Sequence, residues 1–302
     1  MPQIFTFLKL SIIKFYLKRL KQKRANSHMN IKEKRAIFNE NLARFKGKPV
    51  KVKNVAANGI PCLFFEYTES ASANKRPLVL YLHGGAYIKG SVHSYRSLCE
   101  RICHYWQADV LAVDYRLAPE YPFPAAADDA ISAYLWLAAQ YPQQKIILAG
   151  DSAGGGLALA VCKKLIEDDE QKPESLVLFA PWADLSCSSE KMQAMAKNDL
   201  VLDRTELLKA AKMYAGKHPL DHPYISPIHA DFRGFPPVFI QTGAKDLLLH
   251  DSERLHQKLI KADVNSDLDI WKNMWHVFQL FSMVPHADRA LKKAGDFVKQ
   301  QA

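Results

Sequence analysis

Short apolar runs alternate with helix-like stretches along most of the chain, and this alternation constrains the fold more than any other feature. The runs are four or five residues long, too short for helices, and lie at residues 78–82, 110–113, 146–149, 176–179, 238–241 and 268–271. The helix-like stretches lie at about residues 94–106, 124–140, 153–167, 203–215, 251–262 and 285–300. Continuously apolar strands need cover on both faces. The pattern therefore predicts a mostly parallel central sheet with helices on both faces.

Two segments depart from this alternation. Apolar-rich runs at 50–56 and 60–67 flank Asn58-Gly59, and Asn-Gly favours the positive φ angles of a type I′ turn, so we predict a β-hairpin here. The stretch from about 183 to 230 has no such strand–helix pattern and carries several Pro and His residues. We interpret it as a cap insertion over the carboxyl edge of the sheet.

The net charge of +10 is concentrated at the N-terminus. Residues 1–35 contain ten of the 41 basic residues and one of the 31 acidic residues, which leaves 31 basic and 30 acidic residues in the remainder. Nucleic-acid binding would need basic residues spread over a folded face, so we expect no nucleic-acid partner. We divide the chain into a basic amphipathic segment with cap helices, residues 1–48, and one α/β domain with the cap insertion, residues 49–302.

The first 20 residues interleave large apolar side chains with lysines. A membrane-spanning helix needs about 20 mostly apolar residues, and a signal peptide carries its charges before the apolar run, so the segment fits neither class. An amphipathic helix fits better. Its apolar face could complete the protein's own cap, or residues 1–28 could contact an anionic membrane, where each basic residue contributes about 1 kcal/mol. A disordered leader is the third alternative.

The five cysteines, an odd number, show no spacing typical of a metal site. Buried free thiols are typical of a reducing compartment. We therefore expect a cytoplasmic protein without a bound metal, either free or peripheral to the inner face of a membrane.

An apolar strand runs directly into Gly150-Asp151-Ser152-Ala153-Gly154, and a helix rich in small residues follows. This is G-x-S-x-G in the strand–turn–helix context that the motif requires. The sharp turn exposes the serine Oγ near a helix N-terminus, where the helix dipole favours negative charge. Side chains at 150 and 154 would collide with the neighbouring strand and helix, which explains the glycines. We predict that Ser152 is a catalytic nucleophile.

His83-Gly84-Gly85-Ala86 follows the predicted strand at 78–82. Attack on a carbonyl places negative charge on its oxygen, and backbone N–H groups aimed at that oxygen lower the barrier. We predict an oxyanion hole made by the amides of Gly84, Gly85 and Ala153. We expect His83 to fix the loop through a hydrogen bond.

One carboxylate and one imidazole follow late strands in the order that a hydrolytic triad of this kind requires. Asp246 comes after the run at 238–241, and His276 comes after the run at 268–271. Both positions lie just past the carboxyl ends of predicted strands, where ligand chemistry collects in open α/β sheets. We predict that His276 takes the proton of Ser152 and that Asp246 holds the imidazole tautomer.

Three ordered motifs make the chain resemble the hormone-sensitive-lipase-like carboxylesterases. They are His-Gly-Gly-Ala-Tyr at 83–87, Asp-Tyr-Arg-Leu-Ala-Pro-Glu at 114–120 and Gly-Asp-Ser-Ala-Gly-Gly at 150–155, with further similarity at 181–185 and 226–227. The resemblance covers about residues 50–300. It implies the α/β-hydrolase fold with a helical cap, and hydrolysis of short- to medium-chain carboxylic esters without a cofactor. Some relatives open lactones or remove acetyl groups.

The chain departs from the family pattern in three places. Ala86 replaces a third glycine, Leu247 replaces the proline that often follows the acid, and Val277 replaces the glycine that often follows the base. Arg116 and Glu120 are expected to belong to an ion-paired loop that supports the site.

The sequence therefore predicts a serine carboxylesterase that acts on a small apolar ester through an acyl-enzyme on Ser152. A membrane-surface, lipase-like esterase acting on lipid-derived esters is the alternative. A non-catalytic ligand-binding protein on the same fold is disfavoured because nucleophile and base are both present. Four aromatic residues are candidates for the apolar substrate pocket: Tyr87, Trp182, Tyr214 and Trp275. The sequence leaves the oligomeric state open.

Overall fold

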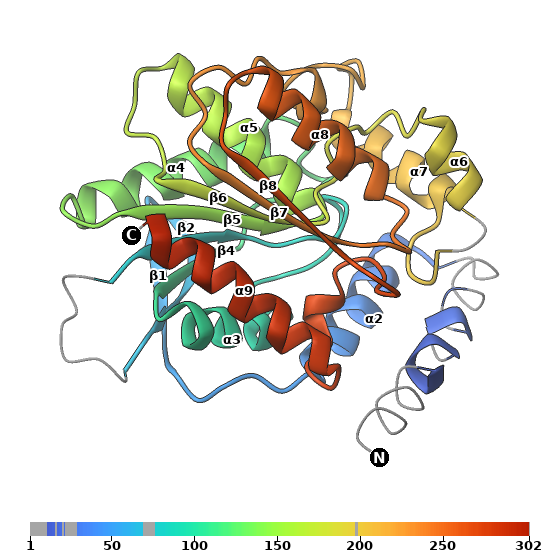
Figure 1. The fold of residues 1–302 in the computed structure, drawn as a ribbon, viewed down its shortest axis with the longest axis horizontal. Helices are drawn as coiled ribbons and strands as arrows, with labels where there is room; N and C mark the ends of the chain where they lie inside the picture. The colour runs from blue at the N-terminus through green and yellow to red at the C-terminus, as the bar shows by residue number, and fades with distance from the viewer. Residues whose placement is uncertain are drawn as a thin grey trace.

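The computed structural model describes residues 11–15, 17–19, 21, 29–68, 76–196 and 199–301. Within these residues the chain forms an eight-stranded sheet with the order β1-β2-β4-β3-β5-β6-β7-β8 (Figure 1). The strands are β1 Lys51–Ala57, β2 Ile60–Glu66, β3 Leu78–Leu82, β4 Asp109–Val113, β5 Ile146–Asp151, β6 Ser175–Phe179, β7 Val238–Gly243 and β8 Ser266–Trp271. β2 is antiparallel to β1 and β4, whereas all other neighbours are parallel.

Helices cover both faces of this sheet. They are α2 Ile31–Ala43, α3 Arg96–Trp106, α4 Ala125–Gln140, α5 Ala153–Glu167, α6 Glu190–Met195, α7 Arg204–Ala215, α8 Leu249–Lys261 and α9 Pro285–Gln301, with 3₁₀ turns η2 Pro227–His229 and η3 Phe278–Leu280. α3 and α9 lie on one face, and α4, α5 and α8 lie on the other (Figure 1). The predicted fold class is confirmed.

The central strands are apolar throughout because each face of the sheet meets its own core. In β3, Leu80 belongs to the core under α4 and α5, whereas Val79 and Tyr81 belong to the core under α3 and α9. All five residues of this strand are buried. Fully burying one such aliphatic side chain contributes about 1.5–3 kcal/mol, so both faces stabilise the strand.

The predicted hairpin is present as β1 and β2. Asn58 and Gly59 have φ angles of 50° and 85°, as a type I′ turn requires. The start of α2 was not singled out from sequence, although a capping box marks it: Asn30 Oδ1 accepts from Glu33 N at 3.0 Å, and Glu33 Oε2 accepts from Asn30 N at 2.9 Å.

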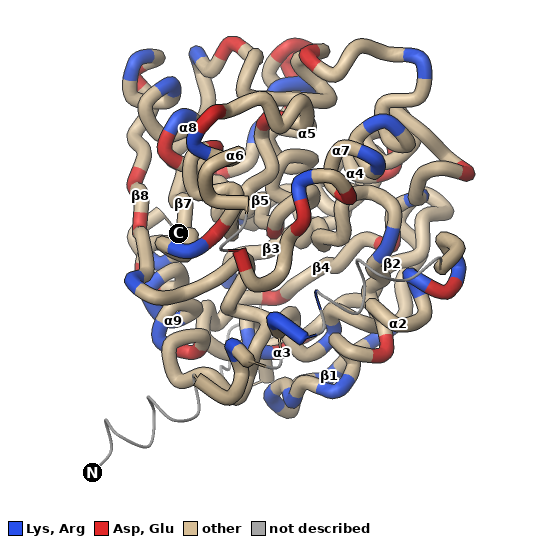
Figure 2. Tube along the Cα trace, turned by 90° about the vertical axis from the view of Figure 1, so that its right-hand side faces the viewer, with Lys and Arg blue, Asp and Glu red and all other residues tan. Residues whose placement is uncertain are grey.

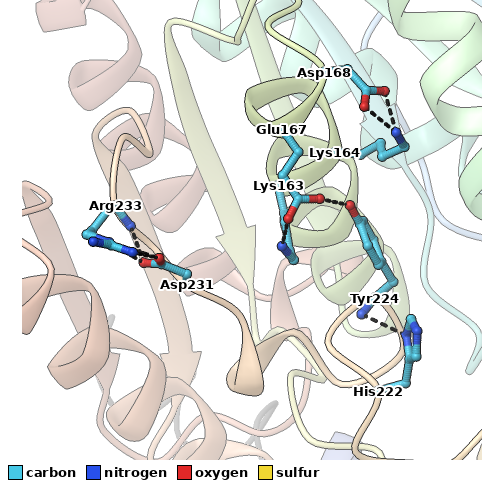
Figure 3. A network of polar contacts seen from close by, with 8 residues as sticks. All are labelled: Lys163, Lys164, Glu167, Asp168, His222, Tyr224, Asp231 and Arg233. Atoms are coloured by element: carbon cyan, nitrogen blue, oxygen red, sulfur yellow. Dashed lines mark hydrogen bonds and ion pairs between the residues drawn. The ribbon is translucent and has the colours of Figure 1, made fainter.

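Side chains fasten the segment that follows α7 to α5 (Figure 3). The Glu167 carboxylate accepts hydrogen bonds from Lys163 Nζ and Tyr224 Oη, and the Lys163 ammonium lies 5.2 Å from the centre of the Tyr224 ring. This network anchors one end of the insertion at about 183–230. The insertion also carries α6 and α7: Lys34 of α2 bonds to Glu206 of α7, and Lys21 of the N-terminal helical residues bonds to Ala196 after α6.

Basic and acidic residues alternate along the chain trace on the side of the molecule that carries α2, α6 and α7 (Figure 2). Among the described residues, no helix combines the length and the apolar character needed to cross a bilayer.

Candidate active site

Ser152 occupies a sharp turn between β5 and α5. Its φ and ψ angles are 52° and −118°, a conformation that costs a non-glycine residue on the order of 1–3 kcal/mol. The predicted close approach around it is also present: a Cβ on Gly154 would lie 2.0 Å from Leu82 O, and one on Gly150 would lie 2.4 Å from Gly154 O. The two glycines thus let the strand, turn and helix pack tightly enough to present Ser152.

His276 and Asp246 form a buried pair at the ends of β8 and β7. His276 Nδ1 lies 3.1 Å and 3.0 Å from Asp246 Oδ1 and Oδ2. Because a carboxylate can only accept here, Nδ1 carries the hydrogen and Nε2 remains free to take a proton. His276 and Ser152 line the same cavity. The structure thus brings the predicted hydroxyl, imidazole and carboxylate to one site.

Backbone hydrogen bonds join the loops that carry the acid and the base. Lys245 N donates to Met274 O at 2.9 Å, and Ala244 N donates to Trp271 O at 3.0 Å. Asp246 itself is fully buried, and its Oδ1 also accepts from Leu248 N at 2.9 Å. The carboxylate therefore has a fixed orientation toward the imidazole.

Three carboxylates set the protonation of His276. Burial lowers the pKa of this imidazole, but Asp246, Asp199 and Asp151 outweigh that effect and raise its pKa above the ordinary value of 6.5. An imidazole with a raised pKa is a stronger base and holds the transferred proton more firmly.

The structure corrects one of the three predicted oxyanion donors. Gly84 N donates to Asp151 Oδ1 at 2.8 Å, so this amide is already engaged. The next two residues, Gly85 and Ala86, border the cavity with Ser152, and no acceptor for their amides is recorded among the described residues. Ala153 is the first residue of α5, where the N–H has no partner within the helix. The amides of Gly85, Ala86 and Ala153 therefore remain available.

Asp151 was not singled out from the sequence, yet it holds the oxyanion loop to the nucleophile turn. Its buried carboxylate accepts from Tyr81 Oη at 2.8 Å and from Tyr95 Oη at 3.0 Å, in addition to Gly84 N. Burial raises the pKa of this carboxyl to about 6, and the three donors oppose the rise. The tyrosines come from distant parts of the chain, and no local motif marks them.

The cavity has a volume of about 370 Å³ and is mostly apolar. Its wall includes Ser152, His276 and parts of the cap. The cap residues are Leu17 and Lys21 from the N-terminal helical residues, Ile37, Phe38, Leu42 and Phe45 from α2 and its end, and Leu200, Val201 and Leu202 from the insertion. Pockets of this size and character are typical of small-molecule sites.

The four predicted pocket aromatics lie elsewhere. Tyr87, Trp182, Tyr214 and Trp275 are fully buried, and none lines the cavity. Tyr87 stacks on Tyr214 with ring centres 3.7 Å apart, and Trp275 packs edge-to-face against Phe281. These rings pack in the interior and do not face the cavity, so their assignment to the substrate pocket was wrong.

The loop containing Arg116 and Glu120 is ion-paired, but to two different elements. Arg116 pairs with Asp129 of α4 at 2.8 Å, and Glu120 pairs with Arg35 of α2 at 2.5 Å. The second pair ties α2 to the body of the domain. His83 fixes its loop as predicted, with Nδ1 2.7 Å from Gly84 O. Among the described residues, no group of three or more His, Cys, Asp or Glu side chains could hold a metal ion.

Comparisons with known proteins agree with this geometry. The sequence pattern of the α/β hydrolase fold family matches residues 79–280. The chain is 39% identical to an acetyl-hydrolase of Streptomyces hygroscopicus over 78% of this chain and 79% of that protein, and 37% identical to an esterase of Acinetobacter venetianus over 75% and 76%. A crystal structure of an esterase from the bacterial hormone-sensitive lipase family superposes with a TM-score of 0.90, at 32% identity over 97% of both chains.

Proposed function

Because the chain belongs to the hormone-sensitive-lipase-like esterases of the α/β-hydrolase fold, and so acts on carboxylic ester bonds, we propose that it does so through an acyl-enzyme on Ser152. The observation that carries this proposal is the buried His276–Asp246 pair beside a cavity that Ser152 also lines.

In the first half-reaction, His276 Nε2 removes the proton of Ser152 Oγ as the oxygen bonds to the carbonyl carbon of the ester. The resulting oxyanion accepts hydrogen bonds from the amides of Gly85, Ala86 and Ala153. Losing one such donor typically costs about 10²–10³ in rate. Asp246 stabilises the imidazolium.

The tetrahedral intermediate then collapses and breaks the bond to the alcohol oxygen. The imidazolium of His276 gives its proton to that oxygen, so the alcohol leaves neutral and the acyl group stays on Ser152. Water repeats the sequence: His276 takes its proton, the hydroxyl attacks the acyl carbon, and collapse returns the proton to Ser152 Oγ. The products are one carboxylic acid and one alcohol.

Ser152→Ala tests this assignment. It removes one oxygen atom at the cavity wall, so we expect an unchanged melting temperature and a loss of at least about 10³ in kcat toward p-nitrophenyl butyrate. Full activity in the folded variant would refute the assignment of Ser152.

We further propose short- to medium-chain esters as substrates, because the cavity is apolar and closed by cap residues. The crystal structure of a similar esterase, EstE5, at 33% identity and TM-score 0.88, comes from a soak with p-nitrophenyl butyrate. A series of p-nitrophenyl esters from two to twelve acyl carbons should show a maximum of kcat/KM below the longest chain. A steady increase up to the longest chain would contradict this range and favour long-chain lipids.

One observation favours the membrane-surface alternative. The helical residues near the N-terminus turn Leu17 and Lys21 toward the cavity but leave Ile12 and Phe15 each 61% exposed. Exposed basic residues Lys18 and Arg19 accompany them, and Arg19 lies over the Phe15 ring at 4.9 Å. An outward face with apolar and basic groups fits an anionic lipid surface.

Vesicle sedimentation tests this second candidate. We expect the full chain to sediment with anionic vesicles at low salt, and the double variant Ile12→Ser with Phe15→Ser to sediment less. Ile260→Ser is the matched control, because Ile260 is 52% exposed on α8, which packs against β7 and β8. No sedimentation of the wild type, or an equal loss in the control, would eliminate lipid contact through this helix.

A further inference from the structure

Asp199 is a buried carboxylate in the insertion, between α6 and α7, and all its recorded side-chain partners are backbone donors. Its Oδ1 accepts from the amides of Val201 and Leu202, both at 2.6 Å. Its Oδ2 accepts from the amide of Leu247, also at 2.6 Å. Asp199 is only 4% exposed, so water does not compete strongly for these bonds.

The third donor gives this cluster its importance, because Leu247 directly follows the triad acid Asp246. The contact therefore joins the cap insertion to the loop that orients the base. Leu247 also stands where the family pattern often has proline, which has no N–H to donate. The bond from the insertion to the acid loop thus depends on a departure of this chain from that pattern.

The charges around the cluster come from several elements. The carboxylates that raise the pKa of His276 are Asp246 on the acid loop, Asp199 on the insertion and Asp151 on the nucleophile turn. Lys21, from the N-terminal helical residues, donates through Nζ to the main-chain oxygens of Asp199 at 2.9 Å and Ala196 at 3.3 Å.

Burial lowers the pKa of Lys14 from the N-terminal helical residues, and the charge of Lys245 on the acid loop lowers it further. Burial and Asp246 raise the pKa of Asp199, whereas the amides of Val201 and Leu202 and the imidazole of His276 oppose that rise. Donors on both oxygens favour the ionised form.

We propose that Asp199 is a positioning residue of the active site: it clamps the cap insertion to the acid loop through the Leu247 amide and places a second negative charge beside His276. This inference rests on the proposed function of His276 and Asp246. Asp199 does not touch the reacting atoms and acts through the acid loop and the field at the imidazole.

Only a carboxylate satisfies all three amides. In Asp199→Asn, the carboxamide oxygen can face either Leu247 N or the pair Val201 N and Leu202 N, and the NH₂ group then faces the other donors. The variant is almost the same size as the wild type, so it removes the charge and at least one of the two sets of amide bonds without leaving a cavity.

Asp199→Asn should lower kcat toward p-nitrophenyl butyrate about tenfold with KM changed less than about twofold, because the clamp affects the transition state more than substrate binding. Removing the charge lowers the pKa of His276. In a plot of kcat/KM against pH, the rise on the acidic side (the acidic limb) should therefore move to lower pH by about half a unit. A merely structural role would not cause this shift.

Leu247→Pro separates the two parts of the proposal. It removes the donated N–H but keeps the carboxylate, so kcat should fall while the acidic limb stays in place. In the double variant the losses should overlap rather than multiply, since both changes break the same bond. If Asp199→Asn does not fold, Leu247→Pro alone tests whether the hydrogen bond between Asp199 and the Leu247 amide matters for catalysis. An unchanged kcat in Leu247→Pro would refute the clamp.

Asp109→Asn is the matched control. Asp109 is a buried carboxylate that accepts one backbone amide, Tyr67 N at 2.8 Å, but it pairs with Arg76 and does not border the cavity. The Asp109→Asn variant should be less stable than the wild type, but the acidic limb of its kcat/KM profile should not shift. The proposal is overturned if folded Asp199→Asn keeps the wild-type kcat and limb, or if Asp109→Asn shifts the limb equally. An inactive wild type would instead refute the triad itself.

Discussion

His276 is the residue whose chemistry depends most on its neighbours. Burial alone would weaken it as a base by lowering its pKa, and the surrounding carboxylates reverse that effect. We therefore expect the acidic limb of kcat/KM to have a midpoint above 6.5, the ordinary value for histidine. Below about pH 6, protonation of Asp151 removes a negative charge near His276 and weakens the bond from the Gly84 amide, so the limb should become steeper than one proton predicts.

A pH profile from about 4.5 to 9 with p-nitrophenyl butyrate checks both features. Asp246→Asn should lower kcat by about 10³–10⁴, because the imidazole loses the acceptor that holds its tautomer. A wild-type midpoint below the ordinary histidine value would show that burial outweighs the carboxylates, contrary to this account.

The sequence sufficed to predict that three residues at strand ends, Ser152, Asp246 and His276, lie at one site. It failed where the outcome depends on a partner from elsewhere in the chain. Gly84 and Gly85 are equivalent by motif, but the carboxylate of Asp151 engages only the first amide. The pocket aromatics were wrong for a related reason: large rings next to a catalytic motif fill the core as readily as they line a cavity.

Among the elements, α8 carries a buried acid, Asp251, in its first turn. Asp251 accepts through Oδ2 from the backbone amide of Asp184, at 3.1 Å, in the loop after β6. Its other oxygen has no recorded partner among the described residues. Burial, reinforced by the charge of Asp184, raises the pKa of Asp251 to about 8.

Asp251→Asn should therefore stabilise the protein increasingly as the pH rises. The folded wild type keeps its proton until about pH 8, whereas the unfolded chain releases it near the ordinary aspartate pKa of 3.8, so wild-type stability falls between these values. The asparagine has no proton to release. The melting temperature of the variant minus that of the wild type should grow from pH 5 to pH 8.

Asp263→Asn serves as the control, because Asp263 is exposed on the turn after α8 and its positive φ also suits asparagine. The melting temperature of Asp263→Asn minus that of the wild type should stay nearly constant with pH. A constant difference for Asp251→Asn as well would mean that Asp251 is ionised in the folded protein.

The strand and helix positions in the α/β domain were largely predictable, because the buried strands of a parallel sheet are short, continuously apolar runs separated by helix-like stretches. β3 and α5 begin and end where the pattern placed them. The bounds of two helices were not predicted from the sequence. α6 has only six residues, and the only sequence signal for α2 is the Asn30 and Glu33 capping box at its start. Neither has the apolar run that made the core elements recognisable.

For the whole molecule, the structure makes one cavity from segments far apart in the chain. The sheet brings the turn after β5 and the loops after β7 and β8 to one edge, and α2, the insertion and the N-terminal helical residues close that edge (Figure 1). The position of the triad residues could be predicted because they follow strands of the sheet. The substrate-facing wall could not, because it lies on the cap, where packing between distant segments decides which side chains turn inward.

If the proposed mechanism holds, Ser152 becomes covalently acylated in this cavity in every catalytic cycle. Intact-protein mass spectrometry after treatment with a p-nitrophenyl alkylphosphonate tests it most directly, because such a reagent traps the attacking oxygen as a stable ester. We expect a single adduct, located by peptide mapping on Ser152, and none in Ser152→Ala. An adduct on another residue, or continued ester hydrolysis by a protein that forms no adduct, would contradict the account.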